Sequence, residues 1–102
     1  MDEASEARGA GLDGTTVPRL SRGVRLRLDE AREVWVLLAP ERVLKPDPIA
    51  VEILKRLDGE TALDDIIDDL AQTFSADRAR VNDDVRGFLT SLAEKGLVEF
   101  GP

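Results

Sequence analysis

The sequence predicts an α+β domain in which a three-stranded antiparallel β-meander is followed by three helices. Three short segments between residues 23 and 45 have the alternation or the β-branched content of strands, and turn residues separate them. After residue 47, apolar residues recur at helical spacing in three segments. Strands grouped before helices favour helices on one face of an antiparallel sheet, and three closely linked helices on a small meander also describe a winged helix-turn-helix shape.

The strands follow from short-range patterns. Residues 23–28 alternate apolar and basic side chains, which is the period of a half-buried strand. After a polar turn, residues 33–38 are rich in β-branched and aromatic residues. A turn at Pro40 leads to a short third strand over residues 42–45, which Pro46 ends.

The first two helices have start signals and apolar stripes. Asp47 is a good N-cap with Pro48 at the first helical position, and Gly59 closes this helix. Its stripe consists of Ile49, Ala50, Ile53, Leu54 and Leu57. Thr61 and Asp64 resemble a capping box for the second helix. The stripe of that helix consists of Leu63, Ile66, Ile67, Leu70 and Phe74.

The third helix begins at a cap formed by Ser75 or Asp77 and ends at Gly96, where a left-handed residue is wanted. Its stripe consists of Val81, Val85, Phe88, Leu89 and Leu92. Residues 97–100 either add a short terminal strand or pack against the domain.

Residues 1–17 are predicted to be a disordered tail or a linker, and residues 18–100 to be the folded domain. The first sixteen residues are small, polar and glycine-rich, so they bury too little apolar surface to offset their ordering entropy. Their deletion is expected to leave the melting temperature nearly unchanged. Such a segment also suits a junction to a neighbouring domain.

Composition argues for a binding module rather than an enzyme. The chain has no cysteine and no histidine, which removes thiolate nucleophiles, the usual zinc ligands and the usual general base. We therefore expect neither cofactor nor catalytic residues. Its net charge of −7 disfavours a phosphate backbone as partner. The sequence lacks both an apolar run of the roughly 20 residues a membrane span needs and a signal-peptide core, which predicts a cytoplasmic protein.

Two charged groups have a plain and a functional interpretation. The aspartates of residues 64–69 could bind magnesium, but they lie opposite the apolar stripe and begin where the helix dipole favours negative charge, so we expect no metal site. A basic group lies on and around the first hairpin: it either meets an acidic peptide or nucleic acid, or is a solvated strand face. Its members are Arg19, Arg22, Arg25, Arg27 and Arg32.

The second strand is apolar on both faces. One face carries Val34, Val36 and Leu38, and the other carries Trp35 and Leu37. If the helices cover the first face, the second needs another cover, because a small domain seldom leaves such residues in water. Either the chain near Pro18 and Leu20 or a partner covers the face of Trp35 and Leu37.

The third strand is expected to be a sheet edge, to which an extended peptide can add itself. The alternative is an edge that Lys45 and Pro46 protect. Apolar residues of the third helix, such as Val85 and Phe88, either line a groove beside that edge or belong to the core.

Several segments, taken in order, resemble the PqqD family. They are VPRL at 17–20, VLLAPER at 36–42, AVEIL at 50–54, LDG at 57–59 and LAEKGLV at 92–98. The resemblance runs from about residue 17 to residue 98, nearly the whole predicted domain.

The resemblance implies a peptide-binding chaperone in the synthesis of pyrroloquinoline quinone. Members of this family hold the precursor peptide PqqA and present it to PqqE, a radical S-adenosylmethionine enzyme, and some are fused to the oxidase PqqC, which would suit the tail. Their winged-helix-like peptide-recognition element docks the peptide against the third strand, beside the third helix. The implied peptide-binding residues are Arg42, Val43, Leu44, Lys45, Val85, Phe88, Leu89 and Leu92. The main alternative is a winged-helix DNA-binding domain, which would require a basic recognition helix.

Overall fold

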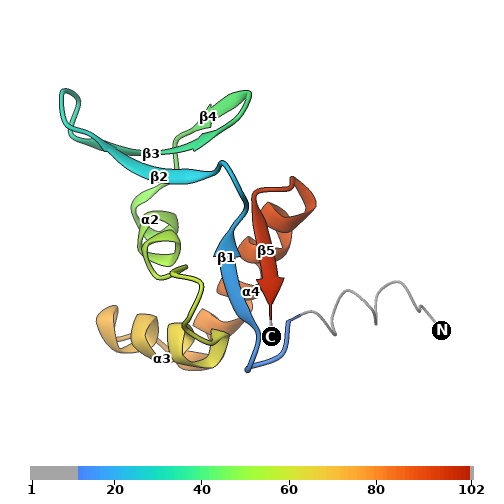
Figure 1. Cartoon of the computed structure of the whole chain (residues 1–102). Coiled ribbons are helices and arrows are strands. Elements are labelled where there is room, and N and C mark those ends of the chain that lie inside the picture. The colour runs from blue at the N-terminus through green and yellow to red at the C-terminus, as the bar shows by residue number, and fades with distance from the viewer. Residues whose placement is uncertain (1–11, 102) are drawn as a thin grey trace.

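Two small antiparallel sheets and three helices make up residues 12–101, the part of the chain that the computed structural model describes (Figure 1). The strands are β1 (Val17–Leu20), β2 (Arg25–Asp29), β3 (Val34–Ala39), β4 (Arg42–Leu44) and β5 (Val98–Gly101). The helices are α2 (Pro48–Lys55), α3 (Leu63–Thr73) and α4 (Arg78–Glu94).

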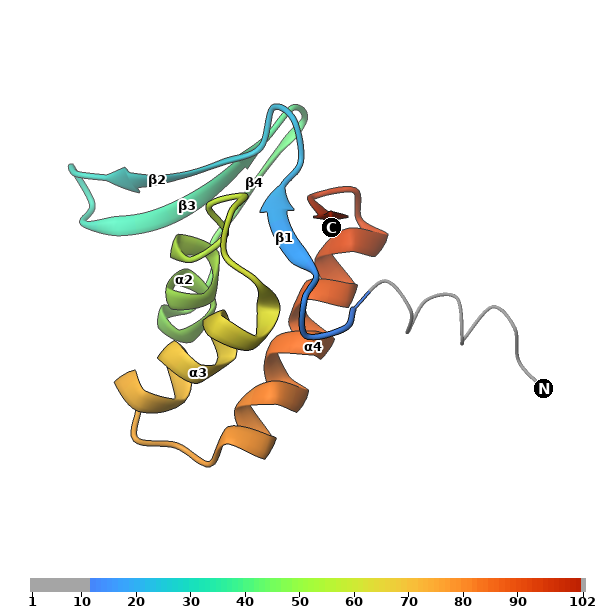
Figure 2. The same cartoon turned by 60° about the horizontal axis from the view of Figure 1, so that its bottom comes forward.

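The larger sheet has the order β2-β3-β4 and is antiparallel throughout. The three-stranded meander and the three helices after it are therefore confirmed, and the arrangement is winged helix-turn-helix-like. The third strand ends at Leu44, one residue before the predicted end. In Figures 1 and 2 the described helices lie on one side of this sheet.

The smaller sheet joins the two ends of the described chain. β1 pairs antiparallel with β5, with Pro18 opposite Phe100. The terminal strand was one of two options left open by the sequence, whereas β1 was not predicted. A proline in a four-residue run argues against a strand, and the partner of β1 lies about 80 residues away in the sequence. Figure 2 shows β1 between the larger sheet and α4.

The face of β3 that points to the helices is the one carrying Leu37. Leu37 is only 2% exposed and belongs to the core, and Trp35 is half-buried with Lys55 Nζ 4.8 Å from its ring centre. The helices thus cover Leu37, and the face of Val34 points away from them. The premise that the helices cover Val34, Val36 and Leu38 was therefore wrong. In the register, Leu37 lies opposite Leu26 and Leu44, which are partly buried against the same core.

The end of the predicted tail packs on the helices. Leu12 is 6% exposed and lies in the core, and Thr16 is buried. For residues 12–17 the prediction of a disordered tail is thus wrong, and residues 1–11 lie outside the described part of the chain. The prediction for residues 1–17 rested on their average composition and overlooked Leu12, a large apolar residue among small and polar neighbours.

Residues 14 and 16 also cap α3. The N–H of Leu63 donates to the carbonyl of Thr16 at 2.7 Å, and the N–H of Asp64 donates to the carbonyl of Gly14 at 3.0 Å. The predicted capping box is wrong, because the N-cap is Ala62 and the Thr61 hydroxyl donates to Asp58 at 2.8 Å. A distant segment therefore satisfies the first amides of α3, which always lack partners within the helix.

The other helix ends follow the sequence more closely. The Asp47 carboxylate accepts a hydrogen bond from the N–H of Ala50 at 2.8 Å, with Pro48 at the start of α2. Gly96, with φ of 76°, follows the end of α4 as expected. No helix in residues 12–101 is long and apolar enough to cross a membrane.

Candidate functional site

Strand β4 has a free edge. Among the described residues it pairs with β3 alone, so its other side presents backbone groups that no strand uses. Val43, in the middle of the strand, is 59% exposed. The predicted edge is thus present, and an edge of this kind is what an extended peptide extends.

The register indicates which residue of β4 faces outward. A two-residue turn joins β3 to β4, with Ala39 opposite Arg42, and such a turn pairs these residues by hydrogen bonds. Hydrogen-bonded and non-hydrogen-bonded pairs alternate along antiparallel strands. The next pair, Leu38 and Val43, therefore directs the N–H and C=O of Val43 to the free edge, and Leu44 turns its own toward β3.

The tip of this hairpin is tied to the end of α4. The Arg42 guanidinium donates to the carbonyl of Lys95 at 3.2 Å. A cavity of about 260 Å³ lies between the two, lined by Pro40 and Glu41 on one side and by Gly96 and Leu97 on the other. The tip of the β3–β4 hairpin is thus held beside the carboxyl-terminal end of α4. Leu44 is half-buried and packs against the core, whereas Lys45 is exposed.

Three of the four predicted groove residues on α4 belong to the core. Val85, Leu89 and Leu92 are buried, and Phe88 is half-buried against the same cluster. Of the four, Phe88 alone is not fully buried. The open question of groove or core is therefore answered mainly in favour of the core.

A small apolar pocket lies where the three helices meet, and we call it the helical pocket. It measures about 140 Å³ and has exposed Ile49 and Phe74 at its mouth, 61% and 43% accessible. Its lining residues are Ile49, Ile53, Leu70, Phe74, Ala76, Arg80, Val81, Asp84 and Val85. Sequence reasoning placed Ile49 and Phe74 in core stripes, and their position at helix ends is the signal that it missed.

A second cavity lies where β3 extends beyond β4. It measures about 410 Å³ and is bordered by Trp35, Lys45, Pro46 and Val51. Because β4 ends at Leu44 while β3 continues to Val34, this part of β3 has a strand neighbour on one side, β2. This cavity borders the segment that joins β4 to α2, and the helical pocket begins at Ile49 in the first turn of α2.

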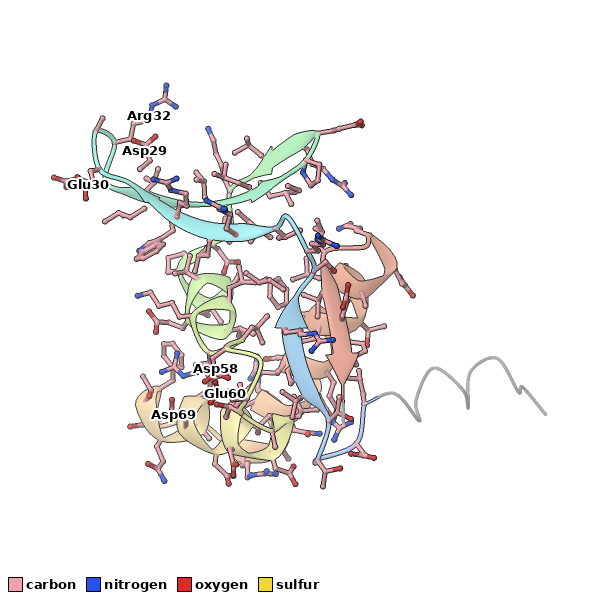
Figure 3. All side chains as sticks on the ribbon, in the orientation of Figure 1. Asp29, Glu30, Arg32, Asp58, Glu60 and Asp69 are labelled. Carbon is pink, nitrogen blue, oxygen red and sulfur yellow. The ribbon has the colours of Figure 1, made fainter. Side chains whose placement is uncertain are left out.

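Three of the four aspartates in the acidic run form ion pairs with arginines. Arg56 on the end of α2 contacts Asp69 at 2.5 Å and Glu52 at 3.0 Å, and Arg78 contacts Asp64 and Asp68. Figure 3 shows Asp58, Glu60 and Asp69 together on this side, far from Asp29, Glu30 and Arg32 at the tip of the β2–β3 hairpin. In residues 12–101 no group of histidine, cysteine or acidic residues has the arrangement of a metal site.

Hydrogen bonds lower two carboxyl pKa values nearby. Bonds from Arg56 and then Lys55 hold the pKa of Glu52 below its ordinary value of 4.5. Those from the backbone of Glu60 and from Thr61 hold the pKa of Asp58 below 3.8. These groups are structural anions: they accept bonds that fix the end of α2 and the turn that follows it.

Comparison with known proteins gives one consistent result. The model of the family described as "Coenzyme PQQ synthesis protein D (PqqD)" matches residues 34–98. A "PqqA binding protein" of Rhodopseudomonas palustris strain BisB5 is 53% identical over 92 residues, which cover 90% of each chain. A "Bifunctional coenzyme PQQ synthesis protein C/D" of Methylorubrum extorquens is 45% identical over 94% of this chain and 26% of its own length.

Two solved structures are also similar. The solution structure of the PqqD part of Methylobacterium extorquens PqqCD, described as a stand-alone recognition element for ribosomally synthesised and modified peptides, is 46% identical. It aligns with a TM-score of 0.73 over 86% of this chain and 94% of that one. The crystal structure of PqqD from Xanthomonas campestris, also 46% identical, aligns with a TM-score of 0.51 over 72% and 82%.

Proposed function

The chain belongs to the PqqD family, and we propose that it binds the precursor peptide PqqA and presents it to the radical S-adenosylmethionine enzyme PqqE during pyrroloquinoline quinone synthesis. The names of the relatives and of the similar solution structure support a peptide-binding role. The relative with an added protein C part supports a physical link to PqqC, which residues 1–11 would make in a fused form. We propose no catalytic role.

The observation that carries this proposal is the free edge of β4, in a hairpin whose tip is tied to the end of α4. Backbone hydrogen bonds to an edge strand hold a peptide without regard to its sequence, and pockets for alternate side chains add selectivity. Val43 offers one N–H and one C=O to the edge, and the half-buried Phe88 provides apolar surface on α4. The helical pocket would take a further apolar side chain of the peptide.

In the proposed complex β4 holds one segment of the peptide, and the peptide bonds or side chains to be modified lie outside that segment. A strand added to β4 buries one set of alternate side chains against α4 and leaves the other set exposed. The remainder of the peptide continues past the sheet and stays available to an enzyme. Presentation in this sense needs no reactive group of the chain itself.

Proline substitutions test the proposed edge. Val43→Pro removes the outward N–H, which should weaken PqqA binding by about 1 kcal/mol, or roughly fivefold in Kd, while the domain stays folded. Leu44→Pro removes an inward N–H and should instead lower the stability of the sheet. Circular dichroism and isothermal titration calorimetry with PqqA measure the two effects separately.

Leu28→Pro is the matched control. By the same alternation the N–H of Leu28 points to the free edge of β2, on the opposite side of the sheet. This variant should fold and bind PqqA as the parent does. Equal PqqA affinity for folded Val43→Pro and the parent would contradict docking at β4, and a loss confined to Leu28→Pro would move the site to β2.

A further inference from the structure

The face of the larger sheet that points away from the helices combines apolar and basic side chains, and we call it the outer face. Residues opposite each other in antiparallel strands share a face. The register therefore puts Leu38 with Arg25 and Val43, Val36 with Arg27, and Val34 with Asp29. Figures 1 and 2 show the described helices on the other side of the sheet.

The apolar part of the outer face is accessible. Val34 is 41% exposed, Val36 and Leu38 are half-buried, and Val43 is the exposed residue of the docking edge. A shallow hollow of about 480 Å³ is lined by the apolar Leu28, Val36 and Leu38, by Arg27, and by the acidic Asp29 and Glu30 at the hairpin tip. Contiguous apolar surface with a charged rim is typical of an interaction site.

The two bases of the outer face, Arg25 and Arg27, have no ion-pair partner among the described residues. Arg56 and Arg78 on the helical side, by contrast, are paired with aspartates. Residues 22–45 carry six basic and four acidic residues, whereas residues 46–102 carry six basic and thirteen acidic ones. Positive charge is thus concentrated on the sheet of an otherwise acidic chain. A partner surface that complements it carries carboxylates around an apolar centre.

The outer face is continuous with the docking edge. Val43 contributes its backbone to the edge and its side chain to the outer face, next to Leu38. A peptide strand added to β4 would extend the sheet, and alternate peptide side chains would project on the outer face. A protein that covers this face would therefore contact both the chain and the bound peptide.

We propose that the outer face docks the enzyme that modifies the bound peptide, through an apolar patch on the enzyme rimmed by carboxylates. This inference rests on the proposed function, since the enzyme is defined by the peptide it acts on. The enzyme then recognises the loaded complex better than the free chain, because the added strand supplies part of the surface. Arg25 and Arg27 set the charge that this contact requires.

The test compares two variants in which the net charge of the chain changes by the same amount. Arg25→Gln with Arg27→Gln neutralises two bases of the outer face, and Arg19→Glu changes the net charge by the same amount on β1, beside Glu99. PqqA and PqqE serve as probes. We expect both variants to bind PqqA within twofold of the parent, and the double variant to bind PqqE at least tenfold more weakly in the presence of saturating PqqA, whereas Arg19→Glu binds it normally.

Val34→Thr provides a second variant that keeps both shape and charge while making one exposed apolar side chain polar, and a severalfold loss of PqqE affinity is expected. Unchanged PqqE affinity in both outer-face variants overturns the inference. A tenfold loss of PqqA affinity in the double variant also overturns it, because the bases would then hold the peptide. If the parent chain fails to bind PqqA at all, the proposed function itself is wrong.

Discussion

Arg56 joins α2 to α3 through one guanidinium group. It donates to Asp69 and to Glu52, and also to the backbone carbonyl of Glu52 at 2.6 Å. The Arg56 side chain is 20% exposed and that of Glu52 is 31% exposed, whereas that of Asp69 is 58% exposed, so water screens the contact with Asp69 more than the contact with Glu52. A single residue thereby orients the two helices that form one side of the helical pocket.

The lowered pKa of Glu52 makes this contact sensitive to pH. A carboxylate whose pKa is depressed in the folded state adds stability above its unfolded pKa, near 4.5, and loses it as pH falls through the lower folded value. Glu52→Gln should therefore be less stable than the parent at pH 7, and the gap should be narrower at about pH 3. Urea unfolding at the two pH values measures it, and a gap that persists in acid would show that the charge of Glu52 is not the cause.

At the scale of elements, the amino-terminal segment and α3 depend on each other. Residues 14 and 16 cap α3, and Leu12 fills part of the core. Removing residues 1–16 should cost about 2 to 4 kcal/mol relative to removing residues 1–11, from one buried leucine and two backbone hydrogen bonds. That loss would lower the melting temperature by roughly 10 °C or more.

Calorimetry of the two truncated chains measures this difference. The shorter deletion is the control, since it leaves every described contact of residues 12–16 in place. Equal melting temperatures for the two chains would show that the segment contributes nothing, as its composition alone suggested.

The helices and the meander could be predicted because each has a local signal. Asp47 and Gly96 stand where a cap and a left-handed residue are needed, and the apolar spacing between them is regular. Strand β1 has no such signal, because Pro18 argues against a strand and its partner lies at the other end of the chain. The cap of α3 was missed for the same reason: its acceptors come from residues far away in the sequence.

The candidate site could be predicted only in part. The edge strand followed from its short length and the proline after it, and the structure places that strand at an edge. Strand pairing could have shown which face of β3 points to the helices, because the apolar Leu26 must share a face with the residue opposite it, Leu37. The burial of Val85 and Leu89 could not have been inferred from the sequence, because an apolar helical stripe has the same pattern whether it lines a groove or fills a core.

At the scale of the whole molecule, charge and function are divided between two layers. The sheet carries the excess of bases and the free edge, and the helical layer carries the excess of acids and the core. In the proposed function the peptide lies at the boundary of the two layers, against β4 and α4. If the outer face docks the enzyme as proposed, the enzyme would lie on the sheet side, where the acidic helices, which would repel its carboxylates, are farthest away.

A titration of the ¹⁵N-labelled chain with PqqA tests the central claim most directly. Strand addition at β4 predicts that the amide of Val43 gains a hydrogen bond, so its resonance should shift strongly, together with those of residues 42–45 and of α4 near Phe88. Amides of β1 and β5 should move little, because the smaller sheet lies outside the proposed site. Saturable shifts confined to β1 and β5, or no shift at Val43 on saturation, would contradict docking at this edge.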